Sequence, residues 1–427
     1  MNEPIQPASL GALLRAARRQ AGLTLEELCT NAGLGVRTVS DLERDRVARP
    51  QRRTIEALVV TLGLDDAGRD AIWALARPRC SGGPVRELGD FLPPDSRDLF
   101  GVQAEARAMR QWFERRKREC PWPVVVSGMP GVGKTRFAVR VGRDLGDQFA
   151  RRIYLDLHGT GDQPMDAAEA ADHLLRRMGV PADAIPESAA ERAQLFRVRM
   201  RTAATLVILD DVRDEAQVRA LLPDDVGDGL VVLVSRRTLA GLEVAWRVTL
   251  TELDPHDAVE LLGALVGPDR MAADAASVKE VIHMCGFLPL ALRIVGNRLA
   301  SRPSWTIAAM AERLRPTDER LSQLSIGDTD TRAAIASSYR QLTPEVRRMF
   351  RRLAMVRGGV VELPRACRLF GADAGQTERA LEELVDAGLL GSADVAGKYV
   401  FNDLLRLYAR ERLVAEESPY TIQHLIG

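Results

Sequence analysis

The sequence predicts a multidomain chain, in which an all-α module is followed by an α/β unit with a parallel sheet and then by mainly helical modules. Its 427 residues allow about three domains at roughly 150 residues each. Between residues 99 and 250, short apolar runs rich in β-branched residues alternate with helical stretches, which is typical of a buried parallel sheet. Helical patterns dominate before and after this region.

The N-terminal module has the pattern of two short helices joined by a glycine turn. Thr24-Leu-Glu-Glu27 is a capping box, with Thr24 as the N-cap and Glu27 reaching back to it. A turn at Gly33–Gly35 leads into a second helix, which we expect from Val36 to about Asp45. Two short helices joined in this way predict a helix-turn-helix.

Five apolar runs predict the strands of the α/β unit. They are Val124–Ser127, Ile153–Leu157, Leu206–Leu209, Leu230–Val234 and Val248–Leu250. Because helical stretches separate them, we expect the strands to form a parallel sheet in an α/β fold.

A phosphate loop follows the first of these strands. Gly128-Met-Pro-Gly-Val-Gly-Lys-Thr135 matches G-x-x-x-x-G-K-[ST] between a strand and a helix, which is the context that the motif requires. Gly128, Gly131 and Gly133 let the backbone wrap around phosphates. We expect Lys134 to reach the β- and γ-phosphates and Thr135 to bind magnesium. The loop therefore predicts ATP or ADP binding with Mg²⁺.

A second acidic motif completes the predicted nucleotide site. The apolar run from Thr205 ends in Asp210 and Asp211, at the edge of a parallel sheet where ligands bind. We expect Asp210 to hold the metal through water, and Asp211 to orient or activate the attacking water as the catalytic residue.

The remainder of the chain is predicted to be mainly helical. Residues 251–325 read as helices. Residues 340–413 read as helices, a hairpin that pairs Leu389–Gly391 with Tyr399–Phe401, and a last helix. We interpret this second stretch as a winged helix. The predicted fold class is thus an all-α helix-turn-helix, an α/β P-loop NTPase, a helical domain and a winged helix.

Three further segments make residues 99–413 resemble the NB-ARC members of the STAND class of nucleotide switches. Val234-Ser-Arg236-Arg237 is similar to the family's sensor motif, which implies that Arg236 contacts the γ-phosphate. Gly286–Leu292 resembles the GLPL motif, which implies that Pro289 packs on adenine. Asn402 stands where the family has a histidine that contacts the β-phosphate of ADP, so the resemblance places Asn402 at the nucleotide.

Residues 8–64 resemble the lambda-repressor-like (XRE) helix-turn-helix domain, through Ala-Gly-Leu-Thr and Val-Ser-Asp-Leu-Glu-Arg. By position, this resemblance implies base contacts in the major groove of double-stranded DNA from Val36, Arg37 and Asp41, phosphate contacts from Arg44, Arg46, Arg52 and Arg53, and an internal ion pair between Arg18 and Glu43. Residues 8–77 hold eleven basic and nine acidic residues, a weak excess for DNA binding. A protein-interaction role for this module therefore stays open.

These readings give a set of expected domain boundaries. They are residues 1–78 for the helix-turn-helix domain, 79–98 for a linker rich in Gly, Pro and Ser, 99–250 for the nucleotide-binding domain, 251–325 for a helical (ARC1-like) domain, 326–415 for the winged helix and 416–427 for a tail.

The composition excludes several classes of protein. The five cysteines form no C-x-x-C pair, which argues against zinc and disulfide frameworks, and no apolar run approaches the ~20 residues that span a bilayer. The N-terminus has no signal sequence. We therefore expect a cytoplasmic protein without a membrane partner.

The function that we predict is a transcription regulator that is off with ADP and on with ATP, self-associates in the ATP state, and hydrolyses ATP slowly as a reset. The alternative is a STAND signalling or defence protein whose N-terminal module recruits a protein. A simple nucleotidase is disfavoured because no substrate domain is evident. Proteins of this kind usually continue into repeats that sense a signal, so we expect the trigger to be read by a further C-terminal region or by another partner.

Overall fold

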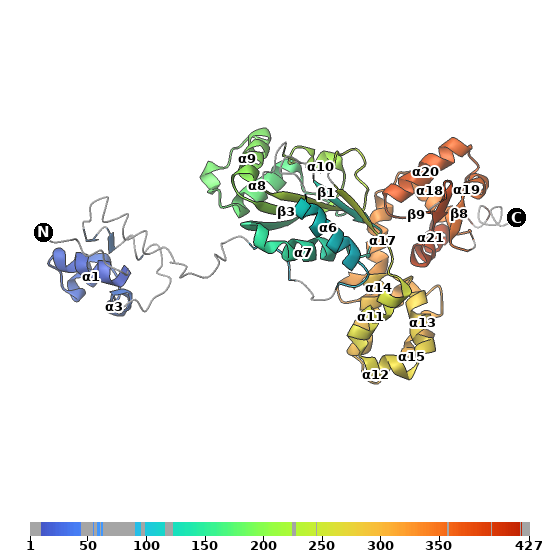
Figure 1. Ribbon diagram of the computed structural model, residues 1–427, viewed down its shortest axis with the longest axis horizontal. Helices are drawn as coiled ribbons and strands as arrows, with labels where there is room; N and C mark the ends of the chain where they lie inside the picture. Colours follow the sequence, from blue (N-terminus) through green and yellow to red (C-terminus); the bar gives the residue numbers. More distant parts are fainter. Residues whose placement is uncertain are drawn as a thin grey trace. The chain divides into compact units, whose positions relative to one another are not determined.

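The computed structural model describes residues 10–43, 54, 58–59, 61–62, 90–94, 99–115, 123–223, 228–244, 246–356, 358–393, 395–418 and 420. The chain divides into two compact units, Met1–Arg86 and Glu87–Gly427, which are described separately below (Figure 1).

Within residues 10–43 of the first unit, the structure shows the short helices α1 (Leu10–Gln20), α2 (Leu25–Ala32) and α3 (Val36–Glu43). The predicted capping box is confirmed, because the Thr24 side chain accepts a hydrogen bond from Glu27 N while the Glu27 carboxylate accepts one from Thr24 N. Gly33 ends α2 with a φ of 64°, a left-handed conformation that glycine adopts at little cost. Helices α2 and α3 therefore form the predicted helix-turn-helix.

A small apolar core and the ion pairs of Glu43 with Arg15 and Arg18 hold these helices together. Leu14, Leu28, Val39 and Leu42 are buried in it. The predicted Arg18–Glu43 pair is confirmed: Arg18 Nε donates to Glu43 Oε1 at 2.6 Å, and this hydrogen bond raises the pKa of Arg18. The pair fixes the end of α3 against α1.

A parallel five-stranded sheet forms the centre of the second unit. The strands are β1 (Val124–Gly128), β2 (Arg151–Asp156), β3 (Thr205–Val212), β4 (Leu230–Ser235) and β5 (Trp246–Leu250). Their spatial order is β2-β3-β4-β1-β5, and every neighbouring pair is parallel. All five strands lie where the apolar runs predict them.

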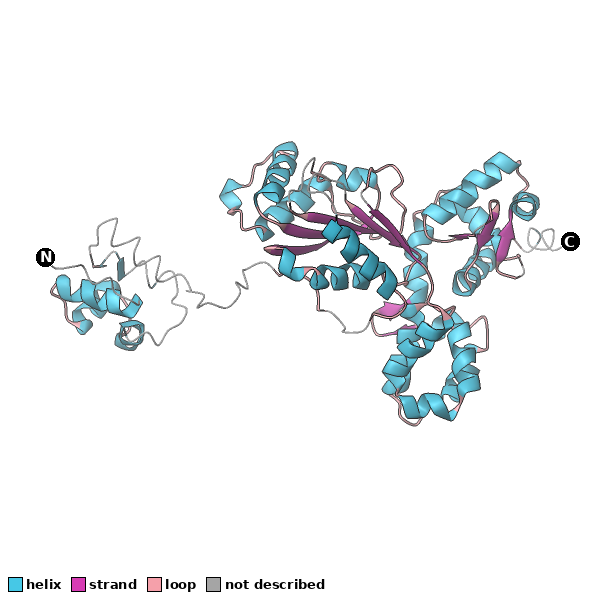
Figure 2. Cartoon of the chain, viewed as in Figure 1, coloured by secondary structure: helices cyan, strands magenta, loops and turns pink. Residues whose placement is uncertain are grey.

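Helices cover both faces of this sheet, as Figure 2 shows. Val124 and Val126 of β1 pack with α6 (Gln103–Arg115) and α7 (Lys134–Asp144), whereas Val125 packs with the opposite group of helices. That group is α8 (Ala167–Arg177), α9 (Ala189–Thr202) and α10 (Glu215–Arg219). The alternation follows from the two-residue period of a strand. Two 3₁₀ turns, Gly146–Gln148 and Ala182–Ala184, complete the connections.

An all-helical group follows the sheet in the chain. It consists of α11 (Pro255–Val266), α12 (Pro268–Ala273), α13 (Ala275–Met284), α14 (Pro289–Ala300), α15 (Ile307–Leu314) and α16 (Arg320–Gln323). Helix α11 packs against α14, and α13 packs against α15. The strand pair β6 (Ser325–Ile326) and β7 (Thr329–Asp330) then leads into α17 (Thr331–Arg340).

The C-terminal module combines helices with a three-stranded sheet. Its helices are α18 (Pro344–Leu353), α19 (Leu363–Phe370), α20 (Ala374–Asp386) and α21 (Asp403–Glu416), and its sheet has the order β8 (Val360–Glu362), β10 (Lys398–Val400), β9 (Gly391–Ser392). Helix α18 packs against α19, α20 and α21. We continue to interpret this arrangement as a winged helix.

The predicted hairpin needs a correction at its first strand. Leu389 and Leu390 lie in the turn after α20, not in a strand, and both of their N–H groups donate to Leu384 O. Both side chains are buried, so their apolar character reflects the core beneath the turn and not a strand. The strand begins at Gly391 and pairs with β10, while β8 was not predicted.

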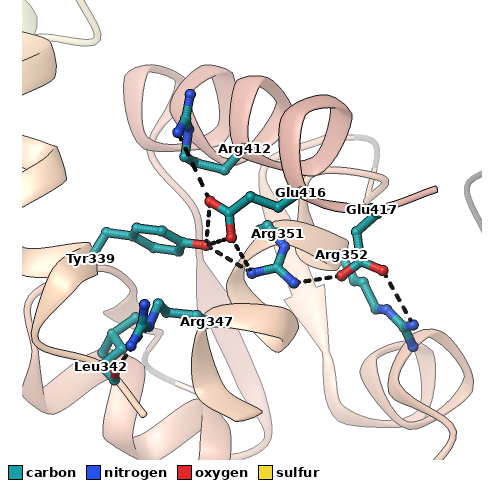
Figure 3. A network of polar contacts seen from close by, with 8 residues as sticks. All are labelled: Tyr339, Leu342, Arg347, Arg351, Arg352, Arg412, Glu416 and Glu417. Carbon is teal, nitrogen blue, oxygen red and sulfur yellow. Dashed lines mark hydrogen bonds and ion pairs between the residues drawn. The ribbon is translucent and has the colours of Figure 1, made fainter. Parts of the chain in front are cut away.

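A polar network ties α17, α18 and the end of α21 together (Figure 3). Arg351 donates to Tyr339 Oη and Glu416 Oε2, both at 2.8 Å, and to Glu417 Oε1 at 2.6 Å. Arg352 lies 3.8 Å from the other Glu417 oxygen. Because burial penalises unpaired charges, these contacts fix the last turn of α21 against α17 and α18.

Candidate nucleotide site

The predicted phosphate loop joins the end of β1 to the start of α7. Its glycines are required by their surroundings, as two positions show. A Cβ on Gly128, whose φ is 139°, would lie 2.4 Å from Leu250 O, and one on Gly131, whose φ is 81°, would lie 2.9 Å from Leu290 Cβ. The loop therefore lies tightly between β5 and α14.

Lys134 lies at the N-terminus of α7 and points back over the loop. Its Nζ donates to Gly128 O at 2.9 Å and to Met129 O at 3.0 Å. Burial and, to a smaller extent, the charge of Arg236 lower the pKa of Lys134 to about 7, although the charges of Asp210 and Asp211 oppose this shift. A phosphate group beside this amine would favour its charged form.

A cavity of about 400 Å³ opens beside the loop and brings most of the predicted residues together. The predicted residues that line it are Gly131, Gly133, Lys134, Thr135, Asp210, Asp211, Arg236 and Pro289. Gly128 and Asn402 are not among its lining residues; both line a second cavity. The residues of the first cavity come from five separate segments, and the fold collects them at the carboxyl ends of β1, β3 and β4.

Asp210 ends the regular part of β3 and is almost completely buried, with 6% of its surface exposed. Tyr154 Oη donates to its Oδ2 at 2.7 Å, and Asp211 N donates to its Oδ1. Burial raises the pKa of Asp210, while hydrogen bonds from Tyr154 and Thr135 oppose this rise. The contact between Thr135 and Asp210 gathers two oxygen donors of the kind that Mg²⁺ prefers, so this pair fits the metal that the loop predicts.

Asp211 has a backbone conformation that is uncommon for a residue other than glycine. Its φ is 49°, and the pairing of β3 with β4 shifts register between Leu209 and Val212. Thr160 fixes the side chain, since its N–H and its hydroxyl both donate to Asp211 Oδ2 at 2.8 Å. Such strain is typical of functional positions, and here it turns the carboxylate toward the cavity.

Arg236 follows β4 and connects the cavity to α17. Its Nη1 donates to Ala334 O at 2.5 Å, to Ser337 Oγ at 2.6 Å and to Ser338 Oγ at 2.9 Å. Burial lowers the pKa of Arg236, and the charges of Asp211 and Asp210 oppose this. The guanidinium is thus a buried cation that lines the cavity and holds a helix of the C-terminal region.

Pro289 is the first residue of α14, and this helix start contacts the phosphate loop. Leu290 N donates to Gly131 O at 3.1 Å. Pro289, Leu290 and Arg293 all line the cavity. The segment that resembles the GLPL motif therefore contributes to the lining of the same cavity as Asp210 and Asp211.

Asn402 is the N-cap of α21, because its Oδ1 accepts a hydrogen bond from Leu404 N at 2.9 Å. Its Nδ2 donates to Glu252 Oε1 at 2.9 Å and to Gly286 O at 3.0 Å. Both hydrogens of the amide are used in these contacts. The structure therefore places Asn402 outside the lining of the first cavity, and Asn402 shares only the second cavity with the predicted ligands Gly128 and Arg236.

The predicted DNA contacts fall mainly beyond the described part of the chain. Val36 lies on α3 with 48% of its surface exposed, and Asp41 on the same helix is half-buried. The side chain of Arg37 and all of Arg44, Arg46, Arg52 and Arg53 lie outside the described residues.

Two family models match this chain. One describes a helix-turn-helix domain and matches residues 9–72; the other describes the NB-ARC domain and matches residues 103–272. The chain carries an NB-ARC domain behind a helix-turn-helix domain. The second match contains the phosphate loop, Asp210 and Arg236, so most of the lining of the cavity described above lies within it, whereas Pro289, Leu290 and Arg293 follow it in the chain.

Curated relatives are similar over a larger part of the chain. The regulatory protein AfsR of Streptomyces coelicolor is 38% identical over 76% of this chain, and AfsR of Streptomyces griseus is 37% identical over 69%. The chain spans only 31% and 30% of the lengths of these two proteins.

A solved structure supports the fold. A Walker-type ATPase of Pyrococcus abyssi is 14% identical, with a TM-score of 0.53, and the match covers 76% of this chain and all of that one. Within the described residues, no helix is long and apolar enough to cross a membrane.

Sequence reasoning missed several residues at the NB-ARC site. Tyr154 and Thr160 position the two aspartates, and Ser337 and Ser338 receive Arg236. Only Asp156, an acid at the carboxyl end of β2 that lines the cavity, had a signal in the sequence. The others are contacts between distant segments.

Proposed function

We propose that this chain is a DNA-binding transcription regulator whose NB-ARC domain acts as a switch, off with ADP and on with ATP. The helix-turn-helix match and the regulatory proteins that resemble the chain support the DNA-binding part. One observation supports the switch: Arg236 lines the nucleotide cavity and also holds α17.

The chemistry of Arg236 explains how a γ-phosphate would act. In the structure its Nη1 is bound to three neutral oxygens of α17. A phosphate oxygen is a stronger partner, because it adds the attraction of a full negative charge to the hydrogen bond, and this attraction is weakly screened at a buried site. ATP therefore competes with α17 for Arg236, whereas ADP leaves the contact in place.

A second connection runs from Asp211 to the same helix. Thr160 binds Asp211, and Gly159, its neighbour in the chain, accepts a hydrogen bond from Gln341 Nε2 at 2.9 Å. Gln341 is the C-cap of α17. Helix α17 is thus attached at two points to loops that line the nucleotide cavity, so that a change at either one acts on the C-terminal module.

The remaining residues of the site bind nucleotide and reset the switch. Lys134 and the loop N–H groups hold the phosphates, and Thr135 with Asp210 holds magnesium, which neutralises phosphate charge. Asp211, fixed by Thr160, orients the attacking water. No substrate domain is evident from the sequence. Slow ATP hydrolysis would therefore serve to return the switch to its ADP state.

In the ATP state, release of the C-terminal module allows several chains to associate. Several helix-turn-helix domains then bind one DNA together, which raises avidity without any new contact to DNA.

A gel-shift titration with genomic DNA fragments tests this proposal. We expect tighter binding with a non-hydrolysable ATP analogue than with ADP, and a steeper dependence on protein concentration. Equal DNA affinity in the two nucleotide states would contradict the proposal that nucleotide controls DNA binding.

The second candidate is a STAND protein whose N-terminal module recruits a protein partner. The near balance of eleven basic and nine acidic residues in residues 8–77 favours it. If the chain binds no DNA at low salt in either nucleotide state, this candidate replaces the first.

A further inference from the structure

The structure contains a second cavity, of about 480 Å³, between the NB-ARC sheet and the C-terminal module. Its floor is formed by the carboxyl ends of β1, β4 and β5, and its roof by residues from the end of α20 to α21. We propose that this cavity binds a neutral, largely apolar small molecule that carries a carbonyl oxygen, and that this molecule contacts both modules at once.

The size and position of the cavity support a ligand site. Packed protein interiors leave few voids larger than a water molecule, and small-molecule sites measure roughly 300–1,000 Å³. The carboxyl edge of a parallel sheet is also where such folds bind ligands. This cavity lies at that edge, beside the first turn of the phosphate loop at Gly128 and Met129.

The lining is mainly apolar, and both modules contribute to it. Met129 and Leu250 come from the NB-ARC domain, and Leu390, Val400 and Leu405 come from the C-terminal module. An apolar ligand would be covered on two sides by these side chains, and its burial would strengthen the contact between the modules.

The charges of the lining favour a neutral ligand. Arg236 and Glu252 are its charged residues. Arg236 donates to three oxygens of α17, and Glu252 accepts a hydrogen bond from Asn402 at 2.9 Å. Since both charges have partners within the protein, an ionic ligand would have to displace them.

A pair of hydroxyls offers one hydrogen bond to such a ligand. Ser127 Oγ and Thr249 Oγ1 lie 3.0 Å apart, and both residues line the cavity. One of the two hydroxyls donates to the other, so one O–H remains to donate to a carbonyl oxygen. The cavity lacks the lysine and the glycine-rich wrapping of the phosphate loop, which distinguishes it from the nucleotide site.

The test uses the full chain in saturating ADP and follows the fluorescence of Nile red, a neutral dye with a carbonyl oxygen. Val400→Trp and Ser392→Trp each place an indole in the cavity lining. Val198→Trp on α9 is the control, because Val198 is exposed to 39% and Val400 to 43%. We expect both cavity variants to bind the dye about tenfold more weakly or worse, which is 1.4 kcal/mol or more, and the control to bind as the parent does.

Melting temperatures and ADP affinity show whether each variant is folded. Two cavity variants are used so that the test still stands if one of them does not fold. Unchanged affinity in a folded cavity variant, equal loss in the control, or displacement of the dye by ADP would each overturn the proposal.

Discussion

At the scale of single residues, the most informative pair is Asp210 and Asp211, two adjacent carboxylates with different surroundings. Asp210 is buried and accepts hydrogen bonds from Tyr154 and the next backbone N–H. Asp211 has a positive φ and is fixed by Thr160. Two groups of the same chemistry can therefore have separate functions, one toward the metal and the other toward water.

Substitution of each aspartate by asparagine should separate these functions. We expect Asp210→Asn to weaken nucleotide binding only when magnesium is present. Asp211→Asn should spare binding and slow phosphate release, since asparagine tolerates a positive φ and keeps an oxygen for Thr160. Calorimetry with and without magnesium, together with a phosphate-release assay, measures both. Equal loss of binding in the two variants contradicts this division.

Asn402 is a helix cap in the structure, and this changes what its substitution should do. Asn402→His removes the side-chain oxygen that caps α21 and alters the contacts with Glu252 and Gly286. We expect a lower melting temperature, from a cap worth about 1 kcal/mol, and an ADP affinity that is unchanged within about twofold. Tighter ADP binding in this variant would instead support the nucleotide contact that the family resemblance implies.

At the scale of elements, α17 does not line the nucleotide cavity but is attached by hydrogen bonds to two loops that do. The double substitution of Ser337 and Ser338 by alanine removes two of the three acceptors of Arg236 Nη1. The contact between Arg236 and α17 is proposed to persist with ADP and to be broken by ATP. When it is weakened, we therefore expect the ratio of ATP-analogue affinity to ADP affinity to rise by about tenfold. Ser301→Ala, at the end of α14, is the control. An unchanged ratio would show that α17 does not respond to nucleotide.

The network at the end of α21 makes a prediction about stability. The Glu417 side chain is 10% exposed and bound to Arg351, whereas the Glu416 side chain is 35% exposed. Glu417→Gln should therefore lower the free energy of unfolding by more than Glu416→Gln, since a more buried ion pair loses more when one partner is removed. Urea denaturation of both variants gives the comparison, and the reverse order would contradict it.

Local sequence patterns predicted the elements, but not the contacts between distant elements. The capping box at Thr24, the five strands and the phosphate loop depend on residues close in the chain, and the structure places them as predicted. The contact of Arg236 with Ser337 joins segments 101 residues apart, and Thr160 reaches Asp211 across 51. No periodicity or motif encodes such pairs, because the fold alone brings them together.

At the scale of the whole molecule, the chain combines a helix-turn-helix domain with an NB-ARC domain, and the proposal requires nucleotide binding in one to change DNA avidity in the other. Lys134→Ala should uncouple them. We expect the variant to fold and to lose nucleotide binding, because Lys134 contributes a charge to phosphate and little to packing. In gel shifts, its DNA affinity should no longer respond to the ATP analogue. Calorimetry that finds normal ATP affinity in the folded variant would contradict the phosphate-loop assignment.

Arg236 lines both cavities of the NB-ARC domain, and this has a thermodynamic consequence. If ATP draws Arg236 away from α17, as proposed, it also changes the lining of the second cavity, so the two ligands are linked. Linkage is reciprocal: the factor by which the first changes the dissociation constant of the second equals the factor by which the second changes that of the first. A molecule in the second cavity would thus change the affinity for ATP by the same factor by which ATP changes the affinity for that molecule. Which of the two molecules acts as the signal then depends on which concentration varies in the cell, because the protein responds to both by the same factor.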